Sequence, residues 1–178
     1  NNRFRNNGIQ IFLGDWEWDG RFCNGITITN NIIYNAPGDS GSYQSITFKG
    51  INSGTLLNEH NTIDVGFDQK AGVMSYSTGS ANNNPDTAAF RNNIVYASDV
   101  ANVDDDIHSN NLYYNSTGVP AVETGKITTD PLFVDRATGD YHLQSGSPAR
   151  NAGANLGYTL DFDGVAIDST PDMGAFQY

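Results

Sequence analysis

Short apolar runs preceded by asparagine recur along the chain. The clearest copies occupy residues 30–34 (Asn-Asn-Ile-Ile-Tyr), 92–96 and 110–114, and weaker copies occupy 2–4 and 61–63. Aligned on the asparagine before the apolar pair, the copies begin at 2, 31, 61, 93 and 111, which gives steps of 29, 30, 32 and 18 residues. A short β-type motif that returns at such a step predicts a solenoid of stacked coils.

Each run is too short, and too rich in β-branched and aromatic residues, to be a helix. A strand of three or four residues cannot bury its apolar face alone, so equivalent strands must stack in register. Asparagines at one place in every coil would then hydrogen-bond to the asparagine above and below. Asparagine also tolerates the left-handed backbone that a sharp corner needs. The competing interpretations are an asparagine-rich loop protein and an ordinary β-sandwich.

Further β-type segments lie between these runs. The pattern predicts strands at residues 8–13, 25–29, 45–49, 54–57 and 73–76, and surface loops at 36–42 and 78–87. No window shows a sustained apolar period of 3.6 residues, so the sequence predicts an all-β protein.

Composition excludes several functional classes. The chain has 178 residues, which is enough for one domain with a sizeable core, and its formal net charge is −11. That charge repels nucleic acid, and it argues against polyanionic sugars unless bound Ca²⁺ mediates. Cys23 is the only cysteine, so we expect neither a disulfide framework nor a multi-cysteine metal site. No run of 18 apolar residues exists to span a membrane.

The two tryptophans form the first candidate binding site. In an extended segment Trp16 and Trp18 would share one face, and three carboxylates flank them in the sequence: Asp15, Glu17 and Asp19. An indole ring stacks on the apolar face of a pyranose, and neighbouring carboxylates accept hydrogen bonds from hydroxyls. The segment therefore indicates a sugar-stacking platform. The alternative is that both rings pack over an open end or side of the solenoid.

Catalytic candidates are fewer. Asp104, Asp105 and Asp106, with His108 close by, could supply acids, and Lys70 could supply a base. Adjacent acids are also typical of a solvated turn, or of a Ca²⁺ site with a structural role. We predict no cofactor and no metal centre, with structural Ca²⁺ left as an open possibility.

The C-terminal tail carries a set of recognisable motifs. Residues 130–133 read Asp-Pro-Leu-Phe, 139–143 read Gly-Asp-Tyr-His-Leu, 147–153 read Ser-Pro-Ala-Arg-Asn-Ala-Gly, and 172–176 read Asp-Met-Gly-Ala-Phe. These motifs closely resemble the C-terminal end of bacterial right-handed parallel β-helix proteins of the pectate-lyase-like superfamily.

The resemblance implies a right-handed, single-stranded parallel β-helix over residues 1–178. Its coils would occupy 1–117, and 118–178 would form the final turns and a C-terminal cap that closes the end of the solenoid. Asp161, Asp163 and Asp172 would then be structural turn residues. Such tails occur on lyases, hydrolases and uncharacterised secreted proteins alike, so the resemblance does not settle function.

The sequence favours a non-catalytic carbohydrate-binding module for a neutral plant polysaccharide, with xylan preferred. A polysaccharide lyase or glycoside hydrolase acting on plant cell-wall polysaccharide is the alternative, and a purely structural or adhesive repeat is the third. The chain opens within a motif and lacks an initiator Met. We therefore expect a module from a larger secreted protein, tethered to a catalytic glycanase, with no nucleic-acid or membrane partner.

Overall fold

The computed structural model describes the backbone of residues 1–5, 9–14, 23–34, 44–49, 51–64, 75–76, 87–97, 100 and 107–178. Side chains are described for 1–4, 25–34, 55–64, 87–97, 100 and 107–178. Within these ranges the protein is all-β apart from one short 3₁₀ helix, and strands of successive coils pair in parallel. The predicted fold class, a parallel β-solenoid, is confirmed.

The first sheet consists of the asparagine-led runs. Its strands are β1 (Arg3–Arg5), β4 (Ile32–Tyr34), β7 (Thr62–Asp64), β10 (Ile94–Tyr96) and β12 (Leu112–Tyr114). One inward-facing row in register contains Phe4, Ile33, Ile63, Val95 and Tyr113. The copies seen in the sequence are therefore neighbours in space.

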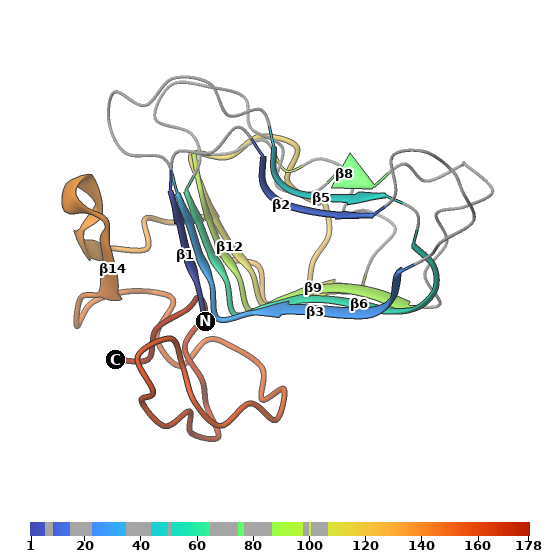
Figure 1. The fold of residues 1–178 in the computed structure, drawn as a ribbon. Helices are drawn as coiled ribbons and strands as arrows, with labels where there is room; N and C mark the ends of the chain where they lie inside the picture. The colour runs from blue at the N-terminus through green and yellow to red at the C-terminus, as the bar shows by residue number, and fades with distance from the viewer. Residues whose placement is uncertain are drawn as a thin grey trace.

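Two further parallel sheets contain the other described strands of the coils. The second sheet contains β2 (Ile9–Gly14), β5 (Gln44–Lys49) and β8 (Ser75–Tyr76), and the third contains β3 (Cys23–Thr29), β6 (Ile51–Glu59), β9 (Thr87–Arg91) and β11 (Ile107–Ser109). The chain visits the sheets in turn, and Figure 1 shows them edge-on around a shared interior. In the 18-residue step, the described strands belong only to the first and third sheets.

The third sheet was only partly predicted. Strand β6 is longer than the expected 54–57, and β9 begins at Thr87, where the sequence predicted the end of a loop. The run Thr87-Ala88-Ala89 contains two residues of low β-propensity, so its sequence gave little strand signal. Pairing with β6 on one side and β11 on the other places it in the sheet.

Both faces of the first sheet are buried. Its inner side chains join Ile28, Leu56 and Phe90 in the interior core. Its outer side chains, such as Ile32 and Ile94, join a second cluster with residues of the tail. Burial on both faces explains why the asparagine-led runs are continuously apolar instead of alternating.

The tail covers the outer face of the first sheet. It includes an antiparallel hairpin of β13 (Phe133–Asp135) and β14 (Asp140–Leu143), joined by the 3₁₀ helix η1 (Arg136–Thr138). Figure 1 shows the tail beside and beneath the first sheet. The physical reason is that the outward apolar residues of β4, β10 and β12 need cover along the whole stack.

Candidate functional site

The residues chosen from the sequence as a binding platform or as catalytic groups lie outside the described part of the chain. These are Asp15, Trp16, Glu17, Trp18, Asp19, Lys70, Asp104, Asp105 and Asp106. Their roles stay predictions. Among the described residues, polar side chains form four arrangements, and two further buried acids, Glu59 and Asp64, bind the tail to the coils.

The first arrangement is an amide ladder at the corner between the third and first sheets. In every coil, the backbone N–H and the Nδ2 of one asparagine donate to the Oδ1 of its successor at 2.8–3.2 Å. The series runs Asn2, Asn31, Asn61, Asn93 and Asn111. Each Nδ2 from Asn31 onward also donates to a backbone carbonyl. The ladder predicted from the sequence is confirmed.

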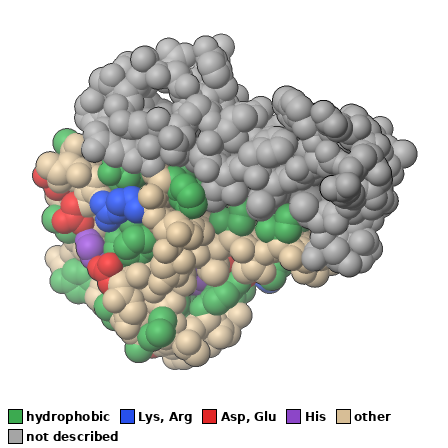
Figure 2. All heavy atoms as spheres, in the orientation of Figure 1, with side chains coloured by type: hydrophobic (Ala, Val, Ile, Leu, Met, Phe, Trp, Pro, Cys, Tyr) green, Lys and Arg blue, Asp and Glu red, His purple; other side chains and the backbone are tan. Residues whose placement is uncertain are grey.

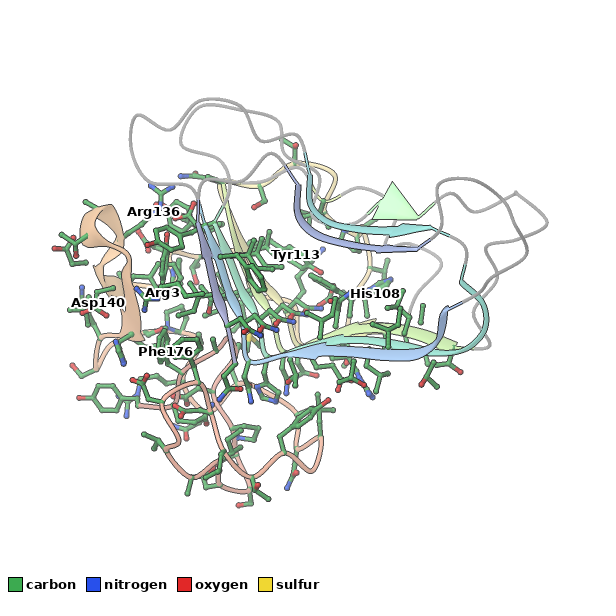
Figure 3. The ribbon with its side chains drawn as sticks, in the orientation of Figure 1. Arg3, His108, Tyr113, Arg136, Asp140 and Phe176 are labelled. Carbon is green, nitrogen blue, oxygen red and sulfur yellow. The ribbon has the colours of Figure 1, made fainter. Side chains whose placement is uncertain are left out.

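Glu123 ends this ladder. Its Oε1 accepts from the backbone N and the Nδ2 of Asn111, both at 2.9 Å. Its Oε2 accepts from the Tyr113 hydroxyl at 2.8 Å and lies 3.3 Å from Nδ1 of His108. Figure 3 shows Tyr113 and His108 pointing into the interior. A buried carboxylate with so many donors is a poor general acid or base, so this site is structural.

Sequence reasoning missed Glu123. The residue lies 12 positions after Asn111 and has no asparagine-led run around it. A ladder in which each rung donates to the next needs only an acceptor at its last position, and a carboxylate is acceptor-only. The position of Glu123 follows no repeat in the sequence, so no periodic pattern predicts it.

The second arrangement is a column of corner residues that precede the ladder positions. Asn30, His60, Asn92 and Asn110 all adopt left-handed backbone with φ of 52–56°. His60 takes the place of an asparagine, and its Nε2 lies 2.9 Å from Nδ2 of Asn92. Desolvation lowers the pKa of His60 to about 4, against raising effects from Glu59 and from backbone hydrogen bonds.

A segment of the tail, residues 152–161, runs along this column and is called the strap below. Asn110 donates to the carbonyl of Ala152, Asn92 exchanges two hydrogen bonds with Ala154, and Asn30 donates to the carbonyl of Leu160. Asn1 donates to the carbonyl of Asp161, and the Tyr158 ring packs edge-on against His60. The strap thus contacts the coils in reverse order, from the last toward the first.

Buried acids fasten the tail to the coils. Glu59 binds the guanidinium of Arg91 and accepts from the Tyr158 hydroxyl at 2.6 Å. Burial raises the pKa of Tyr158 to about 12, and the hydrogen bond to Glu59 adds to the effect. Arg91 lies on a strand of the coils, where a free basic group could act as a catalytic base. Here its guanidinium is held in an ion pair with Glu59.

Asp64, a second buried acid, binds the hairpin to the coils. Arg136 reaches it with Nε at 2.6 Å and Nη2 at 2.8 Å, and the Tyr141 hydroxyl donates to it at 2.9 Å. The guanidinium also lies over the Tyr96 ring, 3.9 Å from its centroid. Burial, together with the neighbouring Asp64, raises the pKa of Tyr141.

The third arrangement is the set of acids in the tail turns. Asp161 accepts from the backbone N–H of Asp163, Val165 and Gln177 at 2.7–2.9 Å. Asp172 accepts from the backbone N–H of Asn151 and Tyr178. Their predicted structural role is confirmed, since N–H donors take the places that a cation would need. The described residues contain no group of three or more His, Cys, Asp or Glu arranged to hold a metal ion.

The fourth arrangement is partly exposed and surrounds His142. Its Nδ1 lies 2.6 Å from Asp140 and its Nε2 lies 2.9 Å from Asp163, and the ring stacks on Phe176 at 4.0 Å. Burial disfavours the protonated imidazole, but the hydrogen bonds and negative charges of Asp140 and Asp163 outweigh burial and raise the pKa of His142. The pKa of Asp140 is lowered, because hydrogen bonds from His142 outweigh its burial.

Arg3 lies near this cluster and donates to the carbonyl of Gly139 at 3.0 Å. Figure 3 shows Arg3, Asp140 and Phe176 on the tail side of the first sheet, and Figure 2 shows acidic, basic and histidine side chains together on one face. A single imidazole ring fills the space between the two carboxylates. The cluster therefore joins parts of the tail to one another.

Comparison with known proteins identifies a family. The described part of the chain contains no helix with the length and apolar character needed to cross a bilayer. No curated protein matches the chain. The sequence model of a family described as "Disaggregatase related" matches residues 2–157, which include all five coils and most of the strap. The chain therefore belongs to the disaggregatase-related family.

Proposed function

We propose that this chain is a non-catalytic module that binds a neutral linear polysaccharide on the outside of its solenoid. The supporting observation is the amide ladder, which holds equivalent side chains of successive coils in register. Neighbouring strands lie about 4.8 Å apart, so equivalent outward positions recur at a fixed step along the stack. A surface with a fixed repeat suits a ligand that also repeats, and solenoids offer extended surfaces of this kind.

The placement of basic groups favours binding over catalysis. A lyase needs a base and a partner for the uronate carboxylate. Each Lys and Arg whose side chain is described makes an internal contact: Arg3 with Gly139, Arg91 with Glu59, Lys126 with Pro120, Arg136 with Asp64, and Arg150 with Ser145 and Tyr178. These basic groups hold parts of the fold together, and so do the acids that they contact, Glu59 and Asp64.

The ligand class follows from charge and from the family. A net charge of −11 favours an uncharged glycan, and xylan is the first to test. A protein that takes aggregates apart, as the family description suggests, needs to hold the material that joins their parts. The proposal includes secretion, a bacterial pectate-lyase-like ancestry and a glycanase in the same parent chain.

The second candidate function is an enzyme, because the family description names an activity. A polysaccharide lyase or glycoside hydrolase would use Asp104, Asp105 or Asp106 with Lys70. Its signature would be new reducing ends or unsaturated products, both lost in Asp105→Asn or Lys70→Met.

Affinity electrophoresis on xylan, β-glucan, mannan and polygalacturonate tests the proposal. We expect retardation by a neutral glycan without product formation. Trp16→Ala and Trp18→Ala test the tryptophan platform and should each weaken retardation. Tyr178→Ala is the matched control, because this aromatic side chain is 65% exposed on the tail. If no neutral glycan retards the protein, the proposed function is wrong.

A further inference from the structure

The third sheet has an outer face, and apart from the Glu59–Arg91 pair and Tyr158 at one edge, none of the contacts described above involves it. Side chains alternate along its strands, and Ile28, Leu56, Ala88 and Phe90 belong to the interior core. Their neighbours in the strands must therefore face outward. These outward residues are Thr27 on β3, Thr55 and Leu57 on β6, Thr87 and Ala89 on β9, and Ile107 on β11.

These residues form two rows across the coils. Thr55 pairs with Thr87 in one row, and the other contains Thr27, Leu57, Ala89 and Ile107. Thr27 and Thr55 are exposed, Leu57 and Thr87 are half-buried, and Ile107 is 57% exposed. Ala89 is buried and lies between Leu57 and Ile107 in its row. We call these two rows the threonine face.

One edge of the threonine face is fixed by the strap. The next outward row contains Glu59 and Arg91, whose ion pair lies beside Tyr158. Figure 1 shows the tail beneath the end of the third sheet that adjoins the first sheet, with no other described segment beneath the rest. The face therefore has a rigid rim on one side.

We infer that the threonine face is where the glycan lies, with its axis across the strands and along the stack. This inference rests on the proposed function. The two rows contain hydroxyl and apolar groups and no charge, in a chain of net charge −11, so they suit an uncharged ligand. Threonine hydroxyls both donate and accept, as sugar hydroxyls require, and the methyl, Leu and Ile groups contact the apolar faces of sugar rings.

The register determines the size of the ligand. The row from Thr27 to Ile107 crosses four strands, and three steps of about 4.8 Å span about 14 Å. That length suits a short stretch of a linear chain, so we expect oligosaccharides to bind much more tightly than the monosaccharide.

The test compares isosteric variants on a glycan that retards the wild-type protein. Thr55→Val with Thr87→Val removes two hydroxyls and keeps β-branched side chains, so the strands should persist. We expect the dissociation constant to rise about fivefold or more. Thr27→Glu adds a charge to the face and should weaken binding further. Thr129→Val is the matched control, since this exposed threonine belongs to the tail.

The outcomes separate this inference from the proposed function. If the wild type is retarded and all threonine variants bind equally well, the threonine face is the wrong location although the module binds glycan. If no neutral glycan retards the wild type, both proposals fail. If sedimentation shows a dimer that Thr27→Glu dissociates, the face binds a second copy and the glycan inference is overturned. Urea midpoints of the variants verify that each one is folded.

Discussion

Two adjacent residues have different roles at each corner between the third and first sheets. The first, Asn30 in its coil, adopts left-handed backbone and turns the chain. The second, Asn31, directs its amide along the stack to the next coil. An asparagine suits both positions for different reasons, because the first needs a tolerated positive φ and the second needs a donor and an acceptor.

A buried rung should be costly to remove. Asn93→Ala removes the acceptor of the Asn61 backbone N and one of the two acceptors of the Asn61 Nδ2. It also removes one donor each from the carbonyl of Asn58 and the Oδ1 of Asn111. Each unsatisfied buried group costs about 1–3 kcal/mol, so we expect a loss of about 3 kcal/mol or more in the free energy of unfolding. Urea unfolding measures it. The exposed Asn155→Ala should change stability by about 0.5 kcal/mol at most, and equal losses would contradict the ladder's role.

His60 should make the protein acid-sensitive. Its pKa is about 4 when folded and 6.5 in the unfolded chain, so the unfolded state takes up the proton first. Its stabilising effect is complete above pH 6.5 and declines as the pH falls toward 4, by about 3 kcal/mol in total. His60→Asn restores the residue type of the column, and should flatten the pH dependence of the urea midpoint in this window. An unchanged slope would show that other groups cause it.

At the scale of elements, the hairpin and the first sheet depend on one another. The outer apolar side chains of β4, β10 and β12 need cover, and the hairpin needs an apolar surface to pack on. The Asp64–Arg136 ion pair, beside these apolar contacts, fixes the position of the hairpin relative to the first sheet. A buried pair of this kind contributes more to geometry than to net stability.

Breaking that pair from one side should detach the hairpin. Asp64→Asn leaves the mostly buried Arg136 without its carboxylate, and removing one partner of a buried pair costs about 3–5 kcal/mol. We expect hydrogen exchange in β14 to speed up before exchange in β10 does. Asp168→Asn, in an exposed turn, is the matched control. Uniform acceleration across the molecule would contradict a local role.

The contribution of the His142 cluster to stability should fall as the pH rises, in the opposite direction to the effect of His60. Its raised pKa means that its contribution is complete below pH 6.5 and is lost as the pH rises through the folded-state value. The group is 45% exposed, so solvent screening keeps the effect small. Melting temperatures at pH 6 and pH 9 should differ less in His142→Gln than in the wild type. A difference of the same size in both would remove His142 as the cause.

At the scale of the whole molecule, the strap converts a stack of coils into one cooperative unit. Solenoid coils contact only their neighbours, so such proteins can unfold piecewise. Here one segment contacts the corner residue of every coil from Asn110 back to Asn30, with Asn1 of the first coil beside its end. Loss of any coil therefore strains contacts made by the others.

Gly153 is the position at which this connection can be tested. A Cβ there would lie 2.9 Å from the carbonyl oxygen of Pro171 and 3.1 Å from that of Asp172. Gly153→Ala should cost about 1–3 kcal/mol through overpacking, and should separate the transitions seen by fluorescence and by circular dichroism. Gly146→Ala meets only an ordinary contact at 3.8 Å and should do neither. Coincident transitions in Gly153→Ala would mean that the coils unfold together without the strap.

The amino-acid sequence by itself determined the coils of the first sheet and the ladder. Both depend on a pattern that repeats at a nearly constant step, and a parallel stack brings equal positions of successive repeats together. The turn roles of Asp161 and Asp172 came from the resemblance of the tail motifs to those of known β-helix proteins. These features depend on short-range chemistry or on strict repetition.

Only the tertiary structure decided where the tail lies, and which groups it contacts. Glu123 ends the ladder, Asp64 meets Arg136 across 72 residues, and the strap meets the corner column in reverse order. None of these pairs has a period, because each joins a repeated element to a segment that occurs once. The same reason hid the threonine face: its outward residues differ from coil to coil, and only the register of the third sheet aligns them.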